Sequence, residues 1–214
     1  MIVAVDGPTA SGKGTIARAL AAHFALPHLD TGLLYRAVGR QCAVQGGNPD
    51  DPADALAACA FPDSLLADPE LRSEATGGLA SQVSVHPGVR QALYERQRAF
   101  ALQEGGAVLD GRDIGTVIAP EAEVKLFVVA SVPARAERRF REMRAAGRAV
   151  SLSEIAADLE ARDRRDRTRA EAPLVAASDA VLLDTSDLPR EVAIAAAIEI
   201  ARTKAAALPE NRSA

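Results

Sequence analysis

A glycine-rich stretch near the start of the chain combines residue types that bind phosphate. Gly7 and Gly12 let the backbone turn with positive φ and bring amide N–H groups close to an anion, and Lys13 supplies a charge for the outer phosphates. A short apolar run precedes the stretch and a helical pattern follows it, so that helix should direct its N-terminus at the same oxygens. The sequence predicts a nucleotide-binding loop of Gly7, Pro8, Thr9, Ala10, Ser11, Gly12, Lys13, Gly14 and Thr15.

One position departs from the general pattern of such loops. The residue after the lysine is normally a Ser or Thr whose hydroxyl binds Mg²⁺, whereas this chain has Gly14 there and a hydroxyl one place later, at Thr15. The Lys-Gly-Thr form is typical of kinases that phosphorylate nucleoside monophosphates. The alternative is a strand-to-helix turn that binds no ligand, but two glycines, a lysine and a threonine in register favour the phosphate site.

Arginine is concentrated in one segment of the chain. Only three of the 25 basic residues are lysines, and eleven arginines lie within residues 135–169. Seven acids accompany them, which leaves +4 in a chain of formal net charge −4. A guanidinium binds phosphate oxygens through two parallel hydrogen bonds and keeps its charge when desolvated. The segment is predicted to clamp phosphate, with solvated, salt-bridged helix faces as the alternative.

Asp110, Arg112 and Asp113 follow directly after an apolar run. At the carboxyl end of a strand, these carboxylates could organise Mg²⁺ through water or hold a substrate, and Arg112 could reach a phosphate. The alternative is a tight Asp-Gly turn with an incidental ion pair. Asp110 and Thr15 are candidate magnesium contacts through water, and no direct metal ligand is predicted.

Asp30 and Thr31 stand where they could cap the helix that carries Arg36. Capping accounts for the first two residues only, because a cation is disfavoured near a helix N-terminus. Arg36 is therefore a candidate for binding an anion.

Arg162, Asp166 and Arg169 are spaced at i, i+4 and i+7 and so share one face of a helix. Two guanidinium groups beside one carboxylate could hold a ribose and a phosphate together.

Apolar runs alternate with amphipathic stretches along the chain. Runs so continuously apolar suit strands covered on both faces, so the sequence predicts a doubly wound parallel α/β sheet flanked by helices, with ligands at the carboxyl ends of the strands. The predicted strands are Ile2–Val5, Ala107–Leu109, Val124–Val129 and Ala180–Leu183. The predicted helices are Lys13–Ala25, Gly32–Gln45, Leu71–Val83, Gly88–Gln103, Ala134–Ala146, Ser153–Arg169 and Arg190–Ala206.

The stretch 46–70 differs from its surroundings. It holds four prolines and six acids and has no Lys, no Arg and no alternating β pattern, which predicts a short surface excursion. We expect one P-loop domain over residues 1–214. Its core is 1–45, 71–134 and 170–206, with an insert at about 46–70 and an Arg-rich lid at about 135–169.

Composition excludes several classes of protein. A chain of 214 residues is too short for a large ATPase machine. Aromatic residues make up 3% with no Trp, so no stacking platform for nucleic acid is expected. The pI of about 5.5 gives no attraction to membranes. The start of the chain leads straight into a strand, so we expect a cytoplasmic protein. We also expect a monomer. Cys42 and Cys59 are predicted to be small buried hydrophobes rather than disulfide or metal ligands.

Several motifs stand in register over residues 1–205. They are the loop Gly7–Thr15, Asp30-Thr31-Gly32-x-x-Tyr35-Arg36, Ala80-Ser81-Gln82-Val83 with Val89-Arg90, Asp110-Gly111-Arg112-Asp113-x-Gly115-Thr116, and Arg162-Asp163-x-x-Asp166-Arg167-x-Arg169-x-x-x-Pro173-Leu174. Together they resemble the motifs of bacterial cytidylate kinases. The resemblance implies transfer of the γ-phosphoryl group of ATP to CMP, and to dCMP, with Mg²⁺. Composition gives no reason to expect a nucleic-acid or membrane partner.

The resemblance also implies roles for single residues. It implies that Ser81, Arg90 and Asp113 contact the cytosine, which suits a carboxylate facing an exocyclic amine. It implies that Arg162 and Asp166 hold sugar hydroxyls and that Asp30 and Thr31 lie on the substrate side. Read without the family, Arg90 fits a solvated helix better. Arginines around the monophosphate are implied at Arg36, Arg112 and Arg169, and a lid arginine reaching ATP is implied at Arg138 or, more weakly, Arg139. The catalytic residues that the resemblance implies are Lys13, Arg112, Asp113 and Arg169.

Two other readings stay open from the residues. Another small P-loop kinase could use a different nucleoside monophosphate or shikimate as its acceptor. A non-catalytic nucleotide switch is a second class, disfavoured because the chain has no Asn-Lys-x-Asp motif for reading guanine. One feature departs from the family, because cytidylate kinases usually have a small antiparallel sheet in the monophosphate insert and 46–70 has no such pattern.

Overall fold

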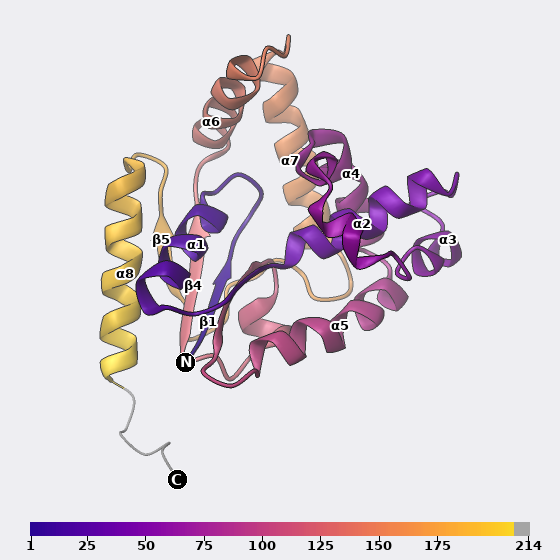
Figure 1. Ribbon diagram of the computed structural model, residues 1–214. Helices are drawn as coiled ribbons and strands as arrows, with labels where there is room; N and C mark the ends of the chain where they lie inside the picture. Colours follow the sequence, from indigo (N-terminus) through magenta and orange to yellow (C-terminus); the bar gives the residue numbers. More distant parts are fainter. Residues whose placement is uncertain (208–214) are drawn as a thin grey trace.

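Five short strands lie side by side in one parallel sheet at the centre of the computed structural model, which describes residues 1–207 (Figure 1). Their order in the sheet is β2-β3-β1-β4-β5, and every neighbouring pair is parallel. The N-terminus lies at the lower end of the sheet in Figure 1, so the carboxyl ends of the strands point up toward α6 and α7. The strands are β1 (Ile2–Asp6), β2 (His28–Asp30), β3 (Ala107–Gly111), β4 (Val124–Val129) and β5 (Val181–Asp184).

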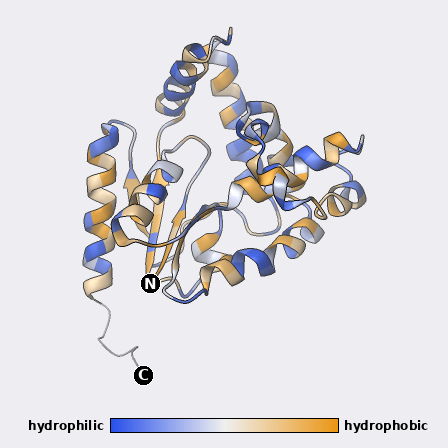
Figure 2. Cartoon of the chain, in the orientation of Figure 1, coloured by the Kyte–Doolittle hydropathy of each residue, from blue (hydrophilic) through white to orange (hydrophobic). Residues whose placement is uncertain are grey.

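Helices cover both faces of this sheet, which explains why the strands are apolar throughout. Val3 and Val5 of β1 pack with α1 (Lys13–Phe24) and α8 (Arg190–Ala206) on one face. Ile2 and Ala4 pack on the other face with residues of α5 (Pro87–Ala101) and of the π-helical turn η3 (Ile114–Ile118). Colouring by hydropathy shows the apolar residues gathered in the strands (Figure 2). The predicted doubly wound α/β class is confirmed.

A helical lobe follows β2 and carries its own apolar cluster. It comprises α2 (Thr31–Val44), α3 (Pro52–Ala57), the 3₁₀ turns η1 (Asp63–Ala67) and η2 (Pro69–Arg72), and α4 (Glu74–Val83). The stretch 46–70 forms helical turns and no strand. The stretch is more buried than predicted, because Ala55, Ala58 and Phe61 pack against α2 and α5.

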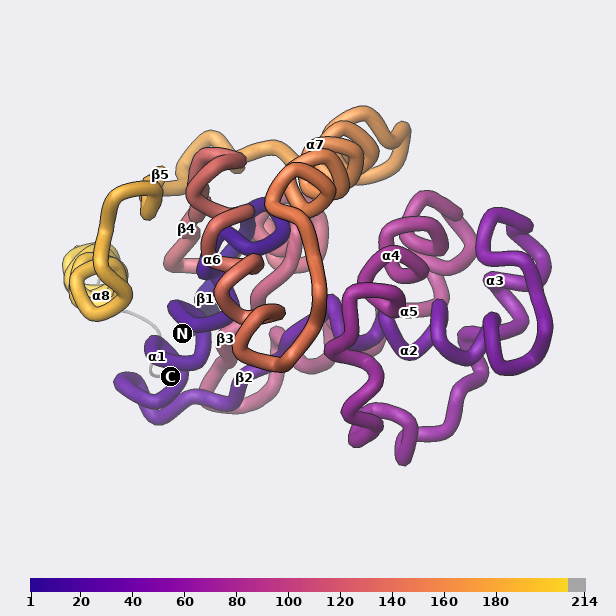
Figure 3. The backbone as a smooth tube through the Cα atoms, turned by 90° about the horizontal axis from the view of Figure 1, so that it is seen from above, coloured from indigo at the N-terminus to yellow at the C-terminus, as the bar shows by residue number. Residues whose placement is uncertain are grey.

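Helices α6 (Val132–Ala145) and α7 (Leu152–Thr168) form a hairpin above the strand ends. Seen from above, α7 lies beside α4 of the helical lobe (Figure 3). Ser151 caps α7 with a reciprocal capping box to Glu154. The hairpin has little apolar core, so a buried ion pair between Arg135 of α6 and Asp163 of α7 also holds it together.

Some local predictions were wrong. Strand β2 was missed because its three residues are His28, Leu29 and Asp30, none fully buried and two of them polar. The helix expected from residue 71 begins at Glu74, because Ser73 caps it and the four residues 69–72 form a separate turn. Cys42 is buried as expected, whereas Cys59 is only partly buried. Within residues 1–207, no helix is long and apolar enough to cross a membrane.

Close packing of α2 against α4 gives a test of this arrangement. A Cβ on Gly39 would lie 2.7 Å from Leu79 Cβ and 2.9 Å from its backbone carbonyl carbon. We expect Gly39→Ala to lower the free energy of unfolding by about 1–3 kcal/mol, because the two helices must move apart.

Gly78→Ala is the matched control, because a Cβ there meets nothing within 4 Å. It should raise the free energy of unfolding by about 0.5–1 kcal/mol through helix propensity. Urea denaturation measures both, and equal effects of the two substitutions would contradict the close approach of α2 and α4.

Candidate active site

The loop between β1 and α1 has the backbone geometry of a phosphate cradle. Gly12 has φ 91° at the start of α1, and Ala10 has φ 61°, a conformation that costs energy for a residue with a side chain. A Cβ on Gly7 would lie 2.0 Å from the carbonyl oxygen of Val128, so only glycine fits there. The first turn of α1 therefore leaves its N–H groups directed at the space above the loop.

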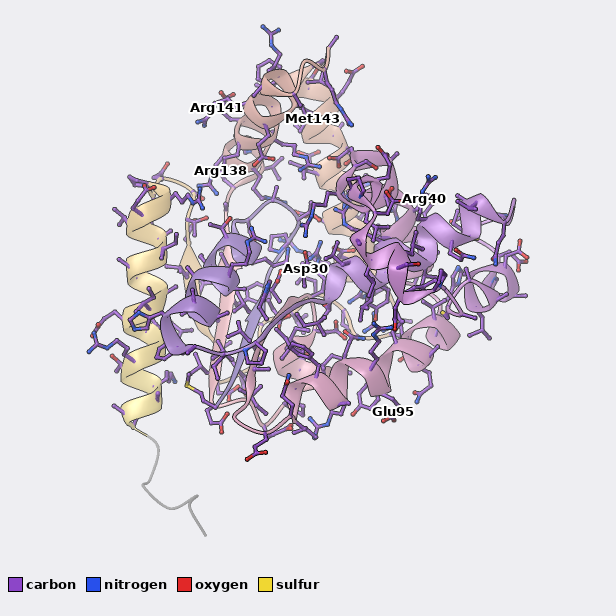
Figure 4. The ribbon with its side chains drawn as sticks, viewed as in Figure 1. Asp30, Arg40, Glu95, Arg138, Arg141 and Met143 are labelled. Carbon is purple, nitrogen blue, oxygen red and sulfur yellow. The ribbon has the colours of Figure 1, made fainter. Side chains whose placement is uncertain are left out.

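A cleft of about 790 Å³ opens above this loop, a size typical of sites for small ligands. Of the nine predicted loop residues, Gly7, Pro8 and Ser11 do not line it. Figure 4 labels three lining residues, Arg138 and Arg141 on α6 and Asp30 near the middle of the molecule. The cleft is lined by Thr9, Ala10, Gly12, Lys13, Gly14, Thr15, Asp30, Arg36, Asp110, Arg112, Arg138 and Arg139, and by the segment 185–190 that leads into α8.

A second, smaller pocket of about 80 Å³ adjoins the cleft. Its walls come from α2, α4, α5, the segment after β3, and the end of α7. Arg36 and Arg112 line both cavities, so the two meet at these guanidinium groups. All the predicted substrate residues except Asp30 line the small pocket: Thr31, Arg36, Ser81, Arg90, Arg112, Asp113, Arg162, Asp166 and Arg169.

Acidic side chains hold the arginines of the small pocket in place. Asp113 accepts a hydrogen bond from Arg90 and lies 3.8 Å from Nη2 of Arg169. Asp166 accepts from Nε of Arg112 at 2.7 Å. Nη2 of Arg169 is buried and has no hydrogen-bond partner in the described residues. A buried guanidinium nitrogen without a hydrogen-bond partner suits an anionic ligand.

One local prediction for this region was wrong. Asp30 stands at the N-cap of α2 but its side chain makes no capping hydrogen bond, while the Thr31 hydroxyl donates to the Asp110 carbonyl at 2.8 Å. Asp166 lines the small pocket together with Arg162 and Arg169, and it also accepts a hydrogen bond from Arg112 on a different segment. Helix α7 ends at Thr168, with Arg169 as its C-cap.

Arg36 lies in the first half of α2, where a helix dipole does not favour a cation. Its Nη1 donates to the carbonyls of Leu71 at 2.8 Å and Ser73 at 2.9 Å. Burial, with the charge of Arg162, lowers the pKa of Arg36 to about 10, which leaves it protonated at neutral pH. The position predicted to bind an anion therefore carries a full positive charge between the two cavities.

Lys13 lies beside the arginines, and its Nζ donates to the Pro8 carbonyl at 3.3 Å. Desolvation of its ammonium group, together with the nearby guanidinium of Arg112, lowers the pKa of Lys13 to about 7. Arg112 also donates to the hydroxyl of Thr9 at 2.6 Å. The loop that forms the cleft is thus in direct contact with an arginine of the small pocket.

Several supporting residues were missed in the sequence. Asp6, at the end of β1, accepts hydrogen bonds from the backbone N–H groups of Ile114 at 2.9 Å and Gly115 at 2.8 Å, which fixes the segment after Asp113. Burial raises the pKa of Asp6 to about 7. His28 Nε2 lies 2.8 Å from Asp110 Oδ1. No motif marks either residue, because only the packing of the strands brings these pairs together.

Thr185 was also missed, although a signal for it was present. It follows β5 in the polar run Asp184-Thr185-Ser186-Asp187, just as Asp110 lies at the end of β3. The Thr185 hydroxyl accepts from Arg138 at 3.1 Å and donates to the Ser11 carbonyl at 2.9 Å. It connects α6 to the phosphate loop on the far side of the cleft.

Comparison with known proteins decides the family of this chain. The family model described as cytidylate kinase matches residues 3–203. The chain belongs to the cytidylate kinase family. A cytidylate kinase from Caulobacter sp. (strain K31) is 55% identical over 94% of both chains, and one from Cereibacter sphaeroides (strain ATCC 17023) is 57% identical over 92% of this chain and 93% of its own.

A solved structure supports the fold alone. An uncharacterized protein from Eubacterium ventriosum ATCC 27560 aligns over 95% of this chain and 98% of its own, with a TM-score of 0.55 and 15% sequence identity. Membership of the cytidylate kinase family therefore rests on the sequence comparisons, and the motifs that carry the resemblance lie around the two cavities.

The lowered pKa of Lys13 predicts proton uptake on nucleotide binding. Phosphate oxygens stabilise the charged amine, so its pKa should rise in the complex. At pH 8 the free amine is mostly neutral and must take up close to one proton as ATP binds. The affinity for ATP should therefore fall as pH rises above about 7.

Isothermal titration calorimetry in buffers of different ionisation enthalpy measures this uptake. Lys13→Arg is the control, because its guanidinium stays charged and should take up no proton. Binding of ATP to the unsubstituted protein at pH 8 with no proton uptake would show that Lys13 is already charged.

Proposed function

We propose that this chain transfers the γ-phosphoryl group of ATP to CMP, and also to dCMP, giving ADP and the nucleoside diphosphate. One observation carries the proposal: a cleft over a phosphate-binding loop meets a smaller, arginine-lined pocket at Arg36 and Arg112. A donor in the first cavity and an acceptor in the second would place their phosphates at these two guanidinium groups. Family membership supports this choice of nucleotides.

The donor side uses the loop and the hairpin. Lys13 and the N–H groups at the start of α1 would hold the outer phosphates of ATP. Arg138 would contact ATP from α6, since it lines the cleft and hydrogen-bonds Thr185 across it. Thr15 and Asp110 line the same cleft and offer the oxygen donors that Mg²⁺ prefers, reached through water. The ion, when bound, would neutralise charge on the β- and γ-phosphates.

The acceptor side uses the small pocket. Asp113 could accept from the exocyclic amine of cytosine, with Ser81 and Arg90 facing the ring acceptors, although Arg90 also pairs with Asp113. Arg162 and Asp166 would hold the sugar. The monophosphate would lie against Arg36, Arg112 and Arg169, and the Arg169 nitrogen that makes no hydrogen bond fits this role.

No general base is required, because the acceptor is already an anionic phosphate. Catalysis would come from alignment of the two phosphates and from positive charge around the transferring group. Residues 135–169, which include most of α6 and all of α7, would act as a lid that excludes water, and 46–70 as the monophosphate-side insert. The monomeric state and cytoplasmic location stay predictions.

An acceptor panel tests the proposed function. ADP release is measured with CMP, dCMP, UMP, AMP, GMP and shikimate in turn. Cytidine acceptors should be used in strong preference. Activity confined to another acceptor would make the chain a different P-loop kinase. Tight nucleotide binding without transfer to any acceptor would indicate a switch.

Arg169→Ala tests the acceptor site. We expect kcat/KM for CMP to fall roughly 10²–10³-fold, because charge around the transferring phosphate is lost, while the dissociation constant for ATP changes little. Arg164→Ala is the matched control, since it removes the same charge from an exposed position on α7, the helix that Arg169 directly follows. Normal turnover of CMP by Arg169→Ala would show that the acceptor phosphate binds elsewhere.

A further inference from the structure

Glu74 connects the two cavities without lining either of them. It is the first residue of α4, directly after the cap Ser73. Its Oε2 accepts from Nε of Arg139 at 2.6 Å and from Nη2 of the same guanidinium, and its Oε1 accepts from Nη1 of Arg162 at 2.7 Å. One carboxylate therefore joins α6, α7 and the helical lobe.

The two arginines belong to different cavities. Arg139 lines the large cleft, and Arg162 lines the small pocket. Each has a second acidic neighbour on its own helix, but Glu142 reaches only Arg139, at 3.3 Å, and Asp158 reaches only Arg162, at 3.6 Å. Among the described residues, Glu74 is the acid that contacts both.

The charge of Glu74 is well supported. Burial acts to raise its pKa, but the guanidinium groups of Arg139, Arg162 and Arg36 outweigh that effect and hold the pKa below its ordinary value. The bridge is therefore ionised at neutral pH. Charge-assisted hydrogen bonds of this kind, partly shielded from water, are stronger than exposed ion pairs.

We propose that Glu74 is a positioning residue that couples the two nucleotide sites. It holds Arg139 on the donor side and Arg162 on the acceptor side, so the docking of α6 and α7 against α4 orders both cavities at once. Each nucleotide then binds more tightly when the other is present, because the first to bind already favours the docked hairpin. The identity of the two nucleotides rests on the proposed function. The contacts of Glu74 with Arg139 and Arg162 are independent of it.

Glu74→Gln tests the coupling, since it keeps the shape of the side chain and removes its charge. Asp158→Asn is the matched control, because it removes an exposed acid that contacts Arg162 alone. The dissociation constant of β,γ-imido-ATP is measured by calorimetry with and without saturating CMP. The ratio of the two constants is the coupling factor.

We expect the coupling factor to fall at least threefold in Glu74→Gln and to stay unchanged in Asp158→Asn. The affinity for β,γ-imido-ATP alone should change less than twofold in both. A coupling factor near one in the unsubstituted protein, or an equal factor in Glu74→Gln, would overturn the proposal.

A second measurement needs no nucleotide. Hydrogen exchange of the α6 amides in the protein alone should be several-fold faster in Glu74→Gln and unchanged in Asp158→Asn, because α6 loses the ion pair of Arg139 with α4. Unchanged exchange in Glu74→Gln would also overturn the proposal. If the acceptor panel selects another acceptor, the proposed function is wrong, and that acceptor replaces CMP in the coupling measurement.

Discussion

Repulsion between arginines is the constraint on which the rest of this structure depends. Many guanidinium groups converge above the carboxyl ends of the strands, and several are buried. Like charges brought together in a medium of low polarity repel one another strongly. The structure offsets this with interleaved carboxylates, each held between guanidinium groups. Asp113 lies between Arg90 and Arg169, and Glu74 lies between Arg139 and Arg162.

The pairs that balance this charge also tie the elements together. Arg112, after β3, pairs with Asp166 of α7, and Arg135 of α6 pairs with Asp163 of α7 and donates to the carbonyl of Thr9 in the phosphate loop. Removing one member of a buried pair leaves the other charge uncompensated, which costs several kcal/mol. Substitution of one member of these ion pairs should therefore also weaken the packing of the α6–α7 hairpin over the sheet. The same interactions support both ligand binding and tertiary structure.

The sequence was sufficient to predict features that depend on local pattern. Apolar runs predicted four of the five strands, and the glycine and lysine spacing predicted the loop at Lys13. The small-pocket residues were identified by their match to family motifs. Their partners could not be predicted, because Asp166 bonds Arg112 only after the fold brings α7 to the end of β3. Glu74 lies in no motif and gains its contacts only through the docking of α4 against the hairpin.

The preference for arginine over lysine follows from the same burial. Desolvation lowers the pKa of Lys13 to about 7, so this amine is only partly charged at neutral pH. Arg36, also largely buried and close to other guanidinium groups, still has a pKa of about 10. A lysine at the position of Arg36 would have a lower pKa to begin with, and the same desolvation would remove much of its charge. A site that collects many cations in little water therefore needs arginine for almost all of them. The one lysine of the site, Lys13, lies where the negative charge of phosphate oxygens can raise its pKa again and so favour the protonated amine.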